Sequence, residues 1–323
     1  MRRALVVGVE GKGPARRGEV KLRETSAIEP LMRCRKEEEN GRMKHQEGFF
    51  KGVRDTSIYF QSWLSESEPK AVLLIVHGLA EHSGRYMNIV NHFVPLGYAV
   101  YGIDHLGHGK SDGMRVYVER FEDYSNTLKV YFDMIRRWQP DKPIFLVGHS
   151  MGGLISAVYL LDHQDELRGA VLSGAAIKIP NHITPAVLFV GKMLSALMPR
   201  FGLLGLEVDG VCRDPAVVQA YVSDPLVHKG KTTARLAAEM LKAMQCVRAE
   251  AAKITLPIMI VQGSADKLVD PAGAQMLYDA VSSADKEIRI YDGFYHEVFN
   301  EPEHDKVLRD VEIWIEVHLG SRK

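Results

Sequence analysis

The chain has few of the residues that build a disulfide scaffold or a metal site. It contains only three cysteines, Cys34, Cys212 and Cys246, and they lie far apart in the sequence. An odd, scattered set argues against a disulfide framework and is typical of a reducing compartment. No C-x-x-C pair is present that would indicate a zinc site. We therefore expect neither a metal nor a cofactor.

An excess of charge and long apolar runs are also missing. Lysine and arginine together number 41, and so do aspartate and glutamate, so the formal net charge is zero. A neutral chain gives no electrostatic case for nucleic acid as a partner. The apolar run at residues 4–9 is shorter than the roughly 7–15 residues of a signal-peptide core. The run at 183–206 is broken by Lys192, Pro199 and Arg200, which disfavours a membrane span. We expect a cytoplasmic, soluble protein, with peripheral contact to membranes left open.

Residues 1–43 lack the apolar period of a folded segment. They are rich in glycine, arginine, lysine and glutamate. Such a segment buries too little apolar surface to offset the entropy lost on ordering. We predict that residues 1–43 are a disordered extension. The alternative is that Met43 is the natural start and the preceding residues are an upstream extension.

From residue 44 onward, short apolar runs alternate with segments of helical length. The runs are 71–76, 98–103, 143–147, 169–172, 257–261 and 287–291. Continuous apolar runs are typical of strands buried on both faces, as in a parallel sheet. Alternation with helices predicts an α/β fold, with a mostly parallel central sheet and helices on both faces.

This alternation stops between residues 176 and 250. No buried strand is recognisable there, and the pattern favours several helices. An insertion between sheet strands is expected above the carboxyl ends of the strands, where ligands bind. We predict a core of residues 44–175 and 251–323, with residues 176–250 as a helical cap.

The segment 148–152, Gly-His-Ser-Met-Gly, fits the G-x-S-x-G pattern. An apolar strand at 144–147 leads into it, and a helix-forming segment at 153–159 follows. Small residues on both sides of the serine allow a tight turn that raises the hydroxyl above the sheet edge. The helix N-terminus also stabilises negative charge that develops beside it. Ser150 is therefore the candidate nucleophile.

A serine hydroxyl needs a general base and an acid that orients this base. On this fold the acid and then the histidine follow the serine in the chain. Asp266 and His296 each lie just after a predicted strand, and Asp270 is the one serious rival for the acid. His105 and His108 are spaced like metal ligands. Because no acid or cysteine set accompanies them, we interpret them as part of a tight loop.

An acyl-transfer site also needs two backbone amides that stabilise the oxyanion. One amide should belong to the residue after the nucleophile, Met151, and the other to the loop after the strand at 71–76. In that loop we choose Leu79. We expect His77 to pack and to hold the loop through hydrogen bonds.

From about residue 45 to residue 319, the chain resembles the monoacylglycerol lipase and lysophospholipase family of α/β-hydrolases. The matching motifs are 77–86, 104–111, 148–153, 221–226, 262–266 and 295–296. The resemblance implies hydrolysis of a single-chain acyl ester through an acyl-enzyme on Ser150, with a mobile cap over an acyl tunnel. Residues 1–43 have no counterpart that we recognise.

The resemblance also implies a polar site for glycerol. In mammalian members, residues that match Glu81, Arg85 and Tyr221 surround this site. The alternative is that Glu81 and Arg85 simply pair with each other on their loop. Phe299 departs from the mammalian pattern, which has a second histidine at this position, and Val269 replaces a cysteine. Both departures put glycerol selectivity in question.

The predicted cap is strongly apolar at residues 183–190 and 193–198. Between residues 167 and 206 there is no aspartate or glutamate. An apolar lid whose only charges are basic suits contact with a lipid surface. The alternative is a helix packed on the core.

The function that we predict is hydrolysis of a carboxylic ester, above all of monoacylglycerol. A lysophospholipase and a general carboxylesterase are the alternatives. A proline-type aminopeptidase shares the triad but needs an acidic site for a free amine, and no such cluster is recognisable in the sequence. A hydrolase fold used as a non-catalytic receptor for small molecules belongs to a different class. The sequence leaves the oligomeric state open.

Overall fold

A computed structural model describes residues 31–33, 43–179, 184–205 and 207–320. Most of segment 1–43, which we predicted to be disordered, lies outside the described residues. Leu31–Arg33 is different, because it forms strand β1 and pairs antiparallel with β2 (Met43–Lys51). These three residues depart from the prediction.

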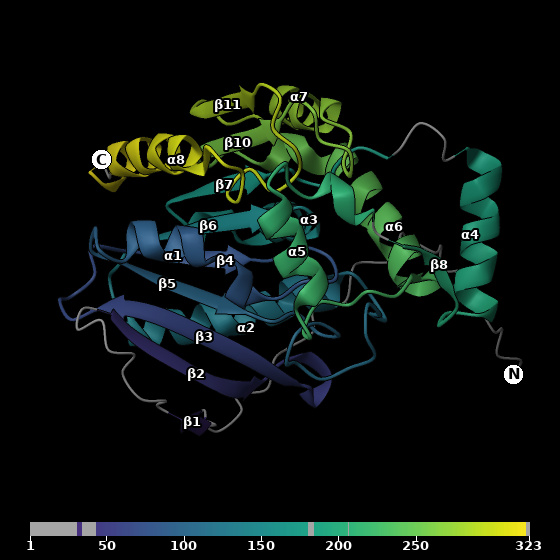
Figure 1. The fold of residues 1–323 in the computed structure, drawn as a ribbon, viewed down its shortest axis with the longest axis horizontal. Coiled ribbons are helices and arrows are strands. Elements are labelled where there is room, and N and C mark those ends of the chain that lie inside the picture. The colour runs from purple at the N-terminus through teal and green to yellow at the C-terminus, as the bar shows by residue number, and fades with distance from the viewer. Residues whose placement is uncertain (1–30, 34–42, 180–183, 206, 321–323) are drawn as a thin grey trace, which may run out of the picture. The chain divides into compact units, whose positions relative to one another are not determined.

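Nine strands of the described residues form one sheet, in the order β1-β2-β3-β5-β4-β6-β7-β10-β11 (Figure 1). The other strands are β3 (Ser57–Ser65), β4 (Ala71–Val76), β5 (Tyr98–Ile103), β6 (Ile144–His149), β7 (Gly169–Ser173), β10 (Ile258–Gly263) and β11 (Lys286–Tyr291). Pairing is antiparallel from β1 through β3 to β5 and parallel between all later neighbours. The prediction of a mostly parallel central sheet is confirmed.

Both faces of the sheet are covered by helices. Along β4, Val72, Leu74 and Val76 pack into one hydrophobic cluster, and the residues between them pack into a second cluster. The first cluster includes α2 (Glu122–Trp138), α3 (Met151–His163) and α7 (Ala272–Ala280), and the second includes α1 (Met87–Phe93) and α8 (His304–Leu319). Because every position of β4 is buried, the strand reads as a continuous apolar run rather than an alternating one.

The strand order places several loops at one edge of the sheet. β4 lies between β5 and β6. The strand that follows β4 in the chain therefore pairs with one side of it, and the next strand, β6, pairs with its other side. In parallel sheets this reversal opens a crevice at the carboxyl ends of the strands. His77 follows β4, Ser150 follows β6 and Asp266 follows β10. The fold thus gathers three predicted site segments at this carboxyl edge.

The segment that we predict to be the cap is mostly helical. Its elements are α4 (Pro185–Leu197), β8 (Gly202–Leu204), α5 (Pro215–Ser223), β9 (Thr232–Thr233) and α6 (Ala234–Glu250). β8 and β9 form a small antiparallel ribbon apart from the main sheet, which the apolar pattern did not predict. α6 contacts both α3 and α4, and α4 lies beyond α6 at the far side from the sheet (Figure 1). The boundaries of the cap stay a prediction.

The helices within the described ranges were also compared with the length and hydropathy that a bilayer requires. Among them, none is both long enough and apolar enough to span a membrane.

Candidate active site

Ser150 lies in the sharp turn between β6 and α3. Its backbone has φ +56° and ψ −119°, a conformation that costs a non-glycine residue about 1–3 kcal/mol. Both motif glycines are needed because α3 packs closely here. A Cβ on Gly152 would lie 2.0 Å from the carbonyl oxygen of Val76, and one on Gly148 would lie 2.3 Å from Ser156 Oγ. The G-x-S-x-G pattern is thus a packing requirement of this turn.

Asp266 has a hydrogen-bond donor at each of its carboxylate oxygens. Its Oδ2 accepts from His296 Nδ1 at 2.7 Å and from Gln262 Nε2 at 2.9 Å. Its Oδ1 accepts from the amides of Leu268 and Val269 at 2.8 and 3.0 Å. Burial alone would raise the pKa of Asp266, but the hydrogen bond and charge of His296 outweigh it, and the pKa is lowered. Because Nδ1 of His296 donates to this carboxylate, Nε2 is the nitrogen left without a proton in the neutral ring.

Asp270 does not contact the histidine. Its carboxylate pairs with Lys178 Nζ at 2.5 Å and accepts from the amide of Ala272 at 3.0 Å. The structure therefore brings Asp266, and not Asp270, to His296.

The end of β7 (Gly169–Ser173) and the glycine that follows it contact both the serine and the histidine. The amide of Ser150 donates to the carbonyl of Ser173 at 2.9 Å. A Cβ on Gly174 would lie 3.2 Å from His296 Nδ1, and the rings of His149 and His296 pack with centroids 4.6 Å apart. Ser150 and His296 therefore lie at the same edge of the sheet.

The loop after β4 packs against the serine. A Cβ on Gly78 would lie 3.2 Å from Ser150 Cβ. Within the ranges that the structure describes, the amides of Leu79 and Met151 donate to no backbone or side-chain acceptor. Two backbone donors near a serine hydroxyl are the requirement for stabilising an oxyanion.

His77 holds the loop after β4 in place through two hydrogen bonds. Its Nε2 accepts from the amide of His105 at 2.8 Å, so its Nδ1 carries the proton and donates to the carbonyl of Gly78 at 2.8 Å. The rings of His105 and His108 pack on His77, with centroids 4.2 and 5.4 Å away. Burial lowers the pKa of all three histidines. This close packing of neutral rings fits the interpretation of a tight loop.

Glu81, Arg85 and Glu297 form a buried charge network. Arg85 donates from Nη1 to Glu81 Oε2 at 2.7 Å and from Nη2 to Glu297 Oε2 at 2.9 Å. Glu81 Oε1 accepts from the amide of Gly78 at 2.6 Å and from the hydroxyl of Tyr86 at 2.7 Å. Burial alone would raise the pKa of Glu81, but Arg85 and nearby histidines lower it to about 2. Glu81 and Arg85 therefore pair with each other, and they also brace the loop after β4.

Glu297 was missed in the sequence, although it directly follows His296. The only sign of it in the sequence is that an acidic residue stands directly before two apolar residues, Val298 and Phe299. Contrary to the prediction from the sequence, the site does contain two neighbouring acidic residues, since Glu81 and Glu297 both contact Arg85. Tyr221 of α5 lies over the same guanidinium, with its ring centroid 4.5 Å from the Arg85 Cζ atom.

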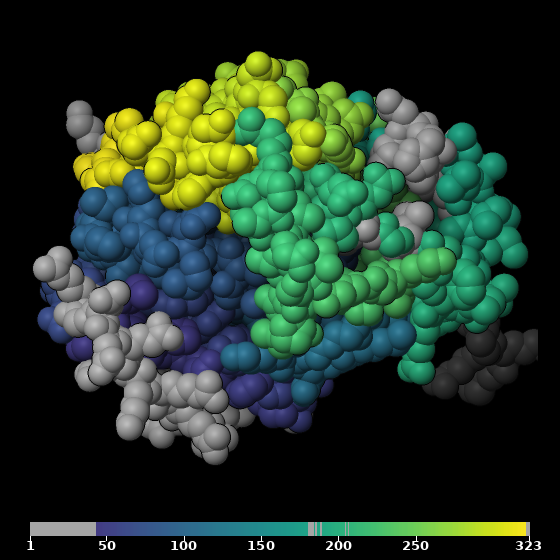
Figure 2. Space-filling model, viewed as in Figure 1, coloured from purple at the N-terminus to yellow at the C-terminus, as the bar shows by residue number. Residues whose placement is uncertain are grey.

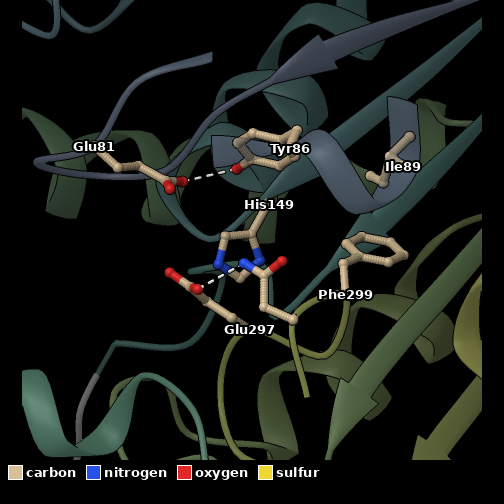
Figure 3. Close-up of a pocket in the computed structure, with 7 residues that line it drawn as sticks. Glu81, Tyr86, Ile89, His149, Glu297 and Phe299 are labelled. Atoms are coloured by element: carbon tan, nitrogen blue, oxygen red, sulfur yellow. Dashed lines mark hydrogen bonds between the residues drawn. The ribbon is translucent and has the colours of Figure 1, made fainter. Parts of the chain in front are cut away.

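A pocket lies beside this network. Its walls are formed by Glu81, Tyr86, Ile89, His149, Glu297, Phe299 and Asn300. In Figure 3 the two carboxylates lie on one side, and the side chains of Ile89 and Phe299 lie on the other. Phe299 therefore gives this pocket an apolar wall at the position where the mammalian pattern has a histidine.

Comparison with known proteins gives consistent matches. Residues 67–303 match the family described as "Serine aminopeptidase, S33". The monoacylglycerol lipase of Mycolicibacterium smegmatis is 38% identical over 84% of this chain and 96% of that protein. The monoglyceride lipase of Mus musculus is 33% identical over 82% of this chain and 88% of that protein. The crystal structure of Paleococcus ferrophilus monoacylglycerol lipase has 30% sequence identity and a TM-score of 0.72, and the match covers 81% of this chain and 99% of that one.

Proposed function

We propose that this chain, which belongs to the serine aminopeptidase S33 family and is similar to the monoacylglycerol lipase of Mycolicibacterium smegmatis, hydrolyses monoacylglycerols. It is a serine hydrolase of lipid esters. The observation that carries the proposal is the strained turn at Ser150 beside the bonded pair of Asp266 and His296. The three residues follow different strands and lie at one edge of the sheet.

In the proposed reaction, Ser150 Oγ attacks the ester carbonyl and His296 Nε2 takes the hydroxyl proton. Asp266 keeps the imidazole ring oriented and stabilises its protonated form. The amides of Leu79 and Met151 stabilise the oxyanion. His296 then gives the proton to the departing glycerol oxygen, which leaves the acyl group on Ser150. Water activated by the same histidine releases the fatty acid.

A substrate panel tests this proposal. It compares p-nitrophenyl esters, mono-, di- and triacylglycerols and lysophospholipids, with Ser150→Ala as the blank. Monoacylglycerols should be hydrolysed far better than triacylglycerols, because the narrow tunnel that the resemblance implies beneath the predicted cap would admit only one acyl chain. Faster turnover of lysophospholipids would favour the lysophospholipase alternative, and turnover of only p-nitrophenyl esters would favour a general carboxylesterase. Ligand binding without sustained turnover would favour a receptor.

We also propose that Glu81, Arg85 and Tyr221 contact the glycerol head. Glu81→Ala should lower monoacylglycerol turnover more than turnover of a p-nitrophenyl ester, which has no glycerol hydroxyls. Loss of such hydrogen bonds costs about 1–3 kcal/mol, or roughly 5- to 150-fold in rate. Tyr86→Phe is the matched control, because it removes one donor to Glu81 and leaves the carboxylate in place. An equal loss on both substrates would mean that Glu81 only braces the loop.

Aminopeptidase activity is the second candidate, because Glu81 and Glu297 lie together near the site. An ammonium group of a peptide substrate would need a carboxylate, but Arg85 contacts both of these. We therefore expect no turnover of aminoacyl p-nitroanilides. Measurable release of p-nitroaniline that Ser150→Ala abolishes would reverse this choice.

We propose that the outer face of α4 makes transient contact with a lipid surface. Phe189 and Leu197 are 64% and 76% exposed, and Lys192 is the only charged residue of the helix. Figure 2 shows this helix at the edge of the visible face. Phe189→Ser should weaken co-sedimentation with anionic vesicles. Ile313→Ser, which changes an exposed apolar residue of α8, is the control. A cytoplasmic location stays a prediction.

A further inference from the structure

The loop that carries His296 is held on both sides by hydrogen bonds. The amide of Tyr295, just before the histidine, donates to Glu301 Oε1 at 2.9 Å. The amide of Glu297, just after it, donates to the carbonyl of Val211 at 2.8 Å. Both bonds are separate from the contact between the imidazole ring and Asp266. The backbone at His296 is therefore fixed from two directions.

Glu301 is the centre of this arrangement. Its side chain is 0% exposed, and a buried carboxylate is tolerated only when it is paired and hydrogen-bonded. Arg213 meets this need, because its backbone amide donates to Oε1 at 3.1 Å and its Nε donates to Oε2 at 2.6 Å. The Arg213 guanidinium also lies over the ring of Phe294, 4.7 Å from the centroid. One carboxylate thus joins Arg213 to the histidine loop.

We propose that Glu301 and Arg213 are positioning residues for His296. The inference rests on the proposed role of His296 as the general base, and neither residue contacts the proposed reacting atoms. Asp266 holds only Nδ1 of the ring, so the backbone decides how far Nε2 lies from the Ser150 hydroxyl. A displacement of about 1 Å at a reacting group can lower a rate about 100-fold.

The same contacts link the histidine to the predicted cap. Arg213 and Val211 both belong to segment 176–250, just before α5 begins at Pro215. The segment entering α5 therefore takes part in placing the base, even though it lies about 85 residues before the histidine in the chain.

The test uses the full chain and a short ester, p-nitrophenyl butyrate, so that binding of a long acyl chain has no influence on the rate. Glu301→Ala should lower kcat about 10- to 100-fold, with KM changed much less. Glu301→Gln keeps an acceptor oxygen for the Tyr295 amide and should recover part of this loss. The acid limb of kcat/KM should move to lower pH in Glu301→Ala, because a displaced ring is stabilised less well by Asp266 in its protonated form.

Glu303→Gln is the matched control. Glu303 also pairs with Arg213, but it is far more exposed and does not bond to the histidine loop. It should leave kcat and the pH profile unchanged. If Glu301→Ala does not fold, Arg213→Gln carries the test, with a smaller loss of kcat in the same direction. A fall in Tm with an unchanged kcat and pH profile in these variants would reduce the pair to a structural role and overturn the inference.

His296→Ala separates this inference from the proposed function. If His296→Ala keeps its turnover, the proposed mechanism fails whatever the Glu301 variants do. If it abolishes turnover while Glu301→Ala and Arg213→Gln keep the parent kcat, only the positioning inference fails.

Discussion

The carboxyl edge of the sheet and helix α4 differ in what they bury. At the sheet edge, the carboxylates of Asp266, Glu81 and Glu301 are buried, and each accepts several hydrogen bonds. On α4, Phe189 and Leu197 are apolar and mostly exposed. Buried polar groups and exposed large apolar groups are the two observations that carry information beyond ordinary packing. The sheet edge therefore holds buried, hydrogen-bonded charges, as a catalytic site does. Helix α4 instead exposes apolar side chains, as a surface that contacts a partner or a lipid does.

Ser150→Ala should have the largest effect, because it removes the reactive atom from the sheet edge. Loss of a triad serine lowers turnover by several orders of magnitude. Ester turnover and labelling by a fluorophosphonate probe measure this loss, and circular dichroism checks that the fold is kept. Near-parent esterase activity in this variant would contradict the mechanism.

Asp266→Asn should be almost as damaging, because His296 would lose its partner and its preferred tautomer. The corresponding change in serine proteases lowers kcat about 10,000-fold. Asp270→Asn is the control, because it breaks only a partly exposed ion pair with Lys178, and such pairs contribute about 0–1 kcal/mol. A greater loss of kcat in Asp270→Asn than in Asp266→Asn would assign the acid to Asp270.

Leu74→Ala and Leu197→Ala compare a buried strand with the exposed face of α4. Leu74 is fully buried in β4, and such a truncation costs about 2–5 kcal/mol of unfolding free energy. Leu197 is 76% exposed, so its truncation should change stability by less than about 0.5 kcal/mol. Urea unfolding measures both. A large loss in Leu197→Ala would mean that α4 packs on the protein in solution.

Acid should destabilise the sheet edge, because its histidines are buried and α4 has none. Burial, with a smaller effect of neighbouring histidines, lowers the pKa of His108 to about 3 and that of His149 to about 4, from 6.5. As the pH falls, these histidines therefore take up protons in the unfolded chain at a higher pH than in the folded protein. Their contribution to the free energy of unfolding is fully present above about pH 6.5 and is lost as the pH falls towards their pKa values in the folded protein.

Tm measured between about pH 7.5 and about pH 4.5 should show this loss. His108→Asn should show a shallower fall, because it removes one buried histidine whose protonation favours the unfolded chain. The asparagine amide can replace the bond from His108 Nδ1 to the carbonyl of Leu106, so the fold should be kept. An equally steep fall in this variant would exclude His108 as a source of the acid sensitivity.

Removal of residues 1–42 should have the smallest effect. A chain beginning at Met43 loses only the three-residue pairing of β1 with β2 from the described sheet. Its Tm should stay within a few degrees of the parent value, and ester turnover should be unchanged. A large fall in Tm would show that the segment contributes to the core.

The main strands could be predicted because a strand buried on both faces appears in the sequence as a short continuous apolar run. β4 and β5 are almost continuously apolar, are buried at every position and are separated by a helix, and the predicted bounds, 71–76 and 98–103, agree with the structure. The ribbon of β8 and β9 could not be predicted in this way. β9 is only Thr232–Thr233, which is too short to show an apolar period.

The site residues divide in the same way. Ser150, Asp266 and His296 lie in local motifs whose order along the chain is itself a signal. Glu301 and Arg213 have no such motif, because their contact joins positions 88 residues apart. No periodicity or turn pattern encodes which distant arginine a buried glutamate will meet, so this contact required the folded structure.

The backbone conformation of Ser150 has a consequence for protein engineering. At φ +56° and ψ −119° a glycine would be relaxed, while a serine gives up about 1–3 kcal/mol of stability. Glycine at this position would therefore give a protein that is more stable to unfolding but has no nucleophile. A laboratory selection for heat resistance alone would favour losing the reactive group, and only a selection that also demands turnover would keep it.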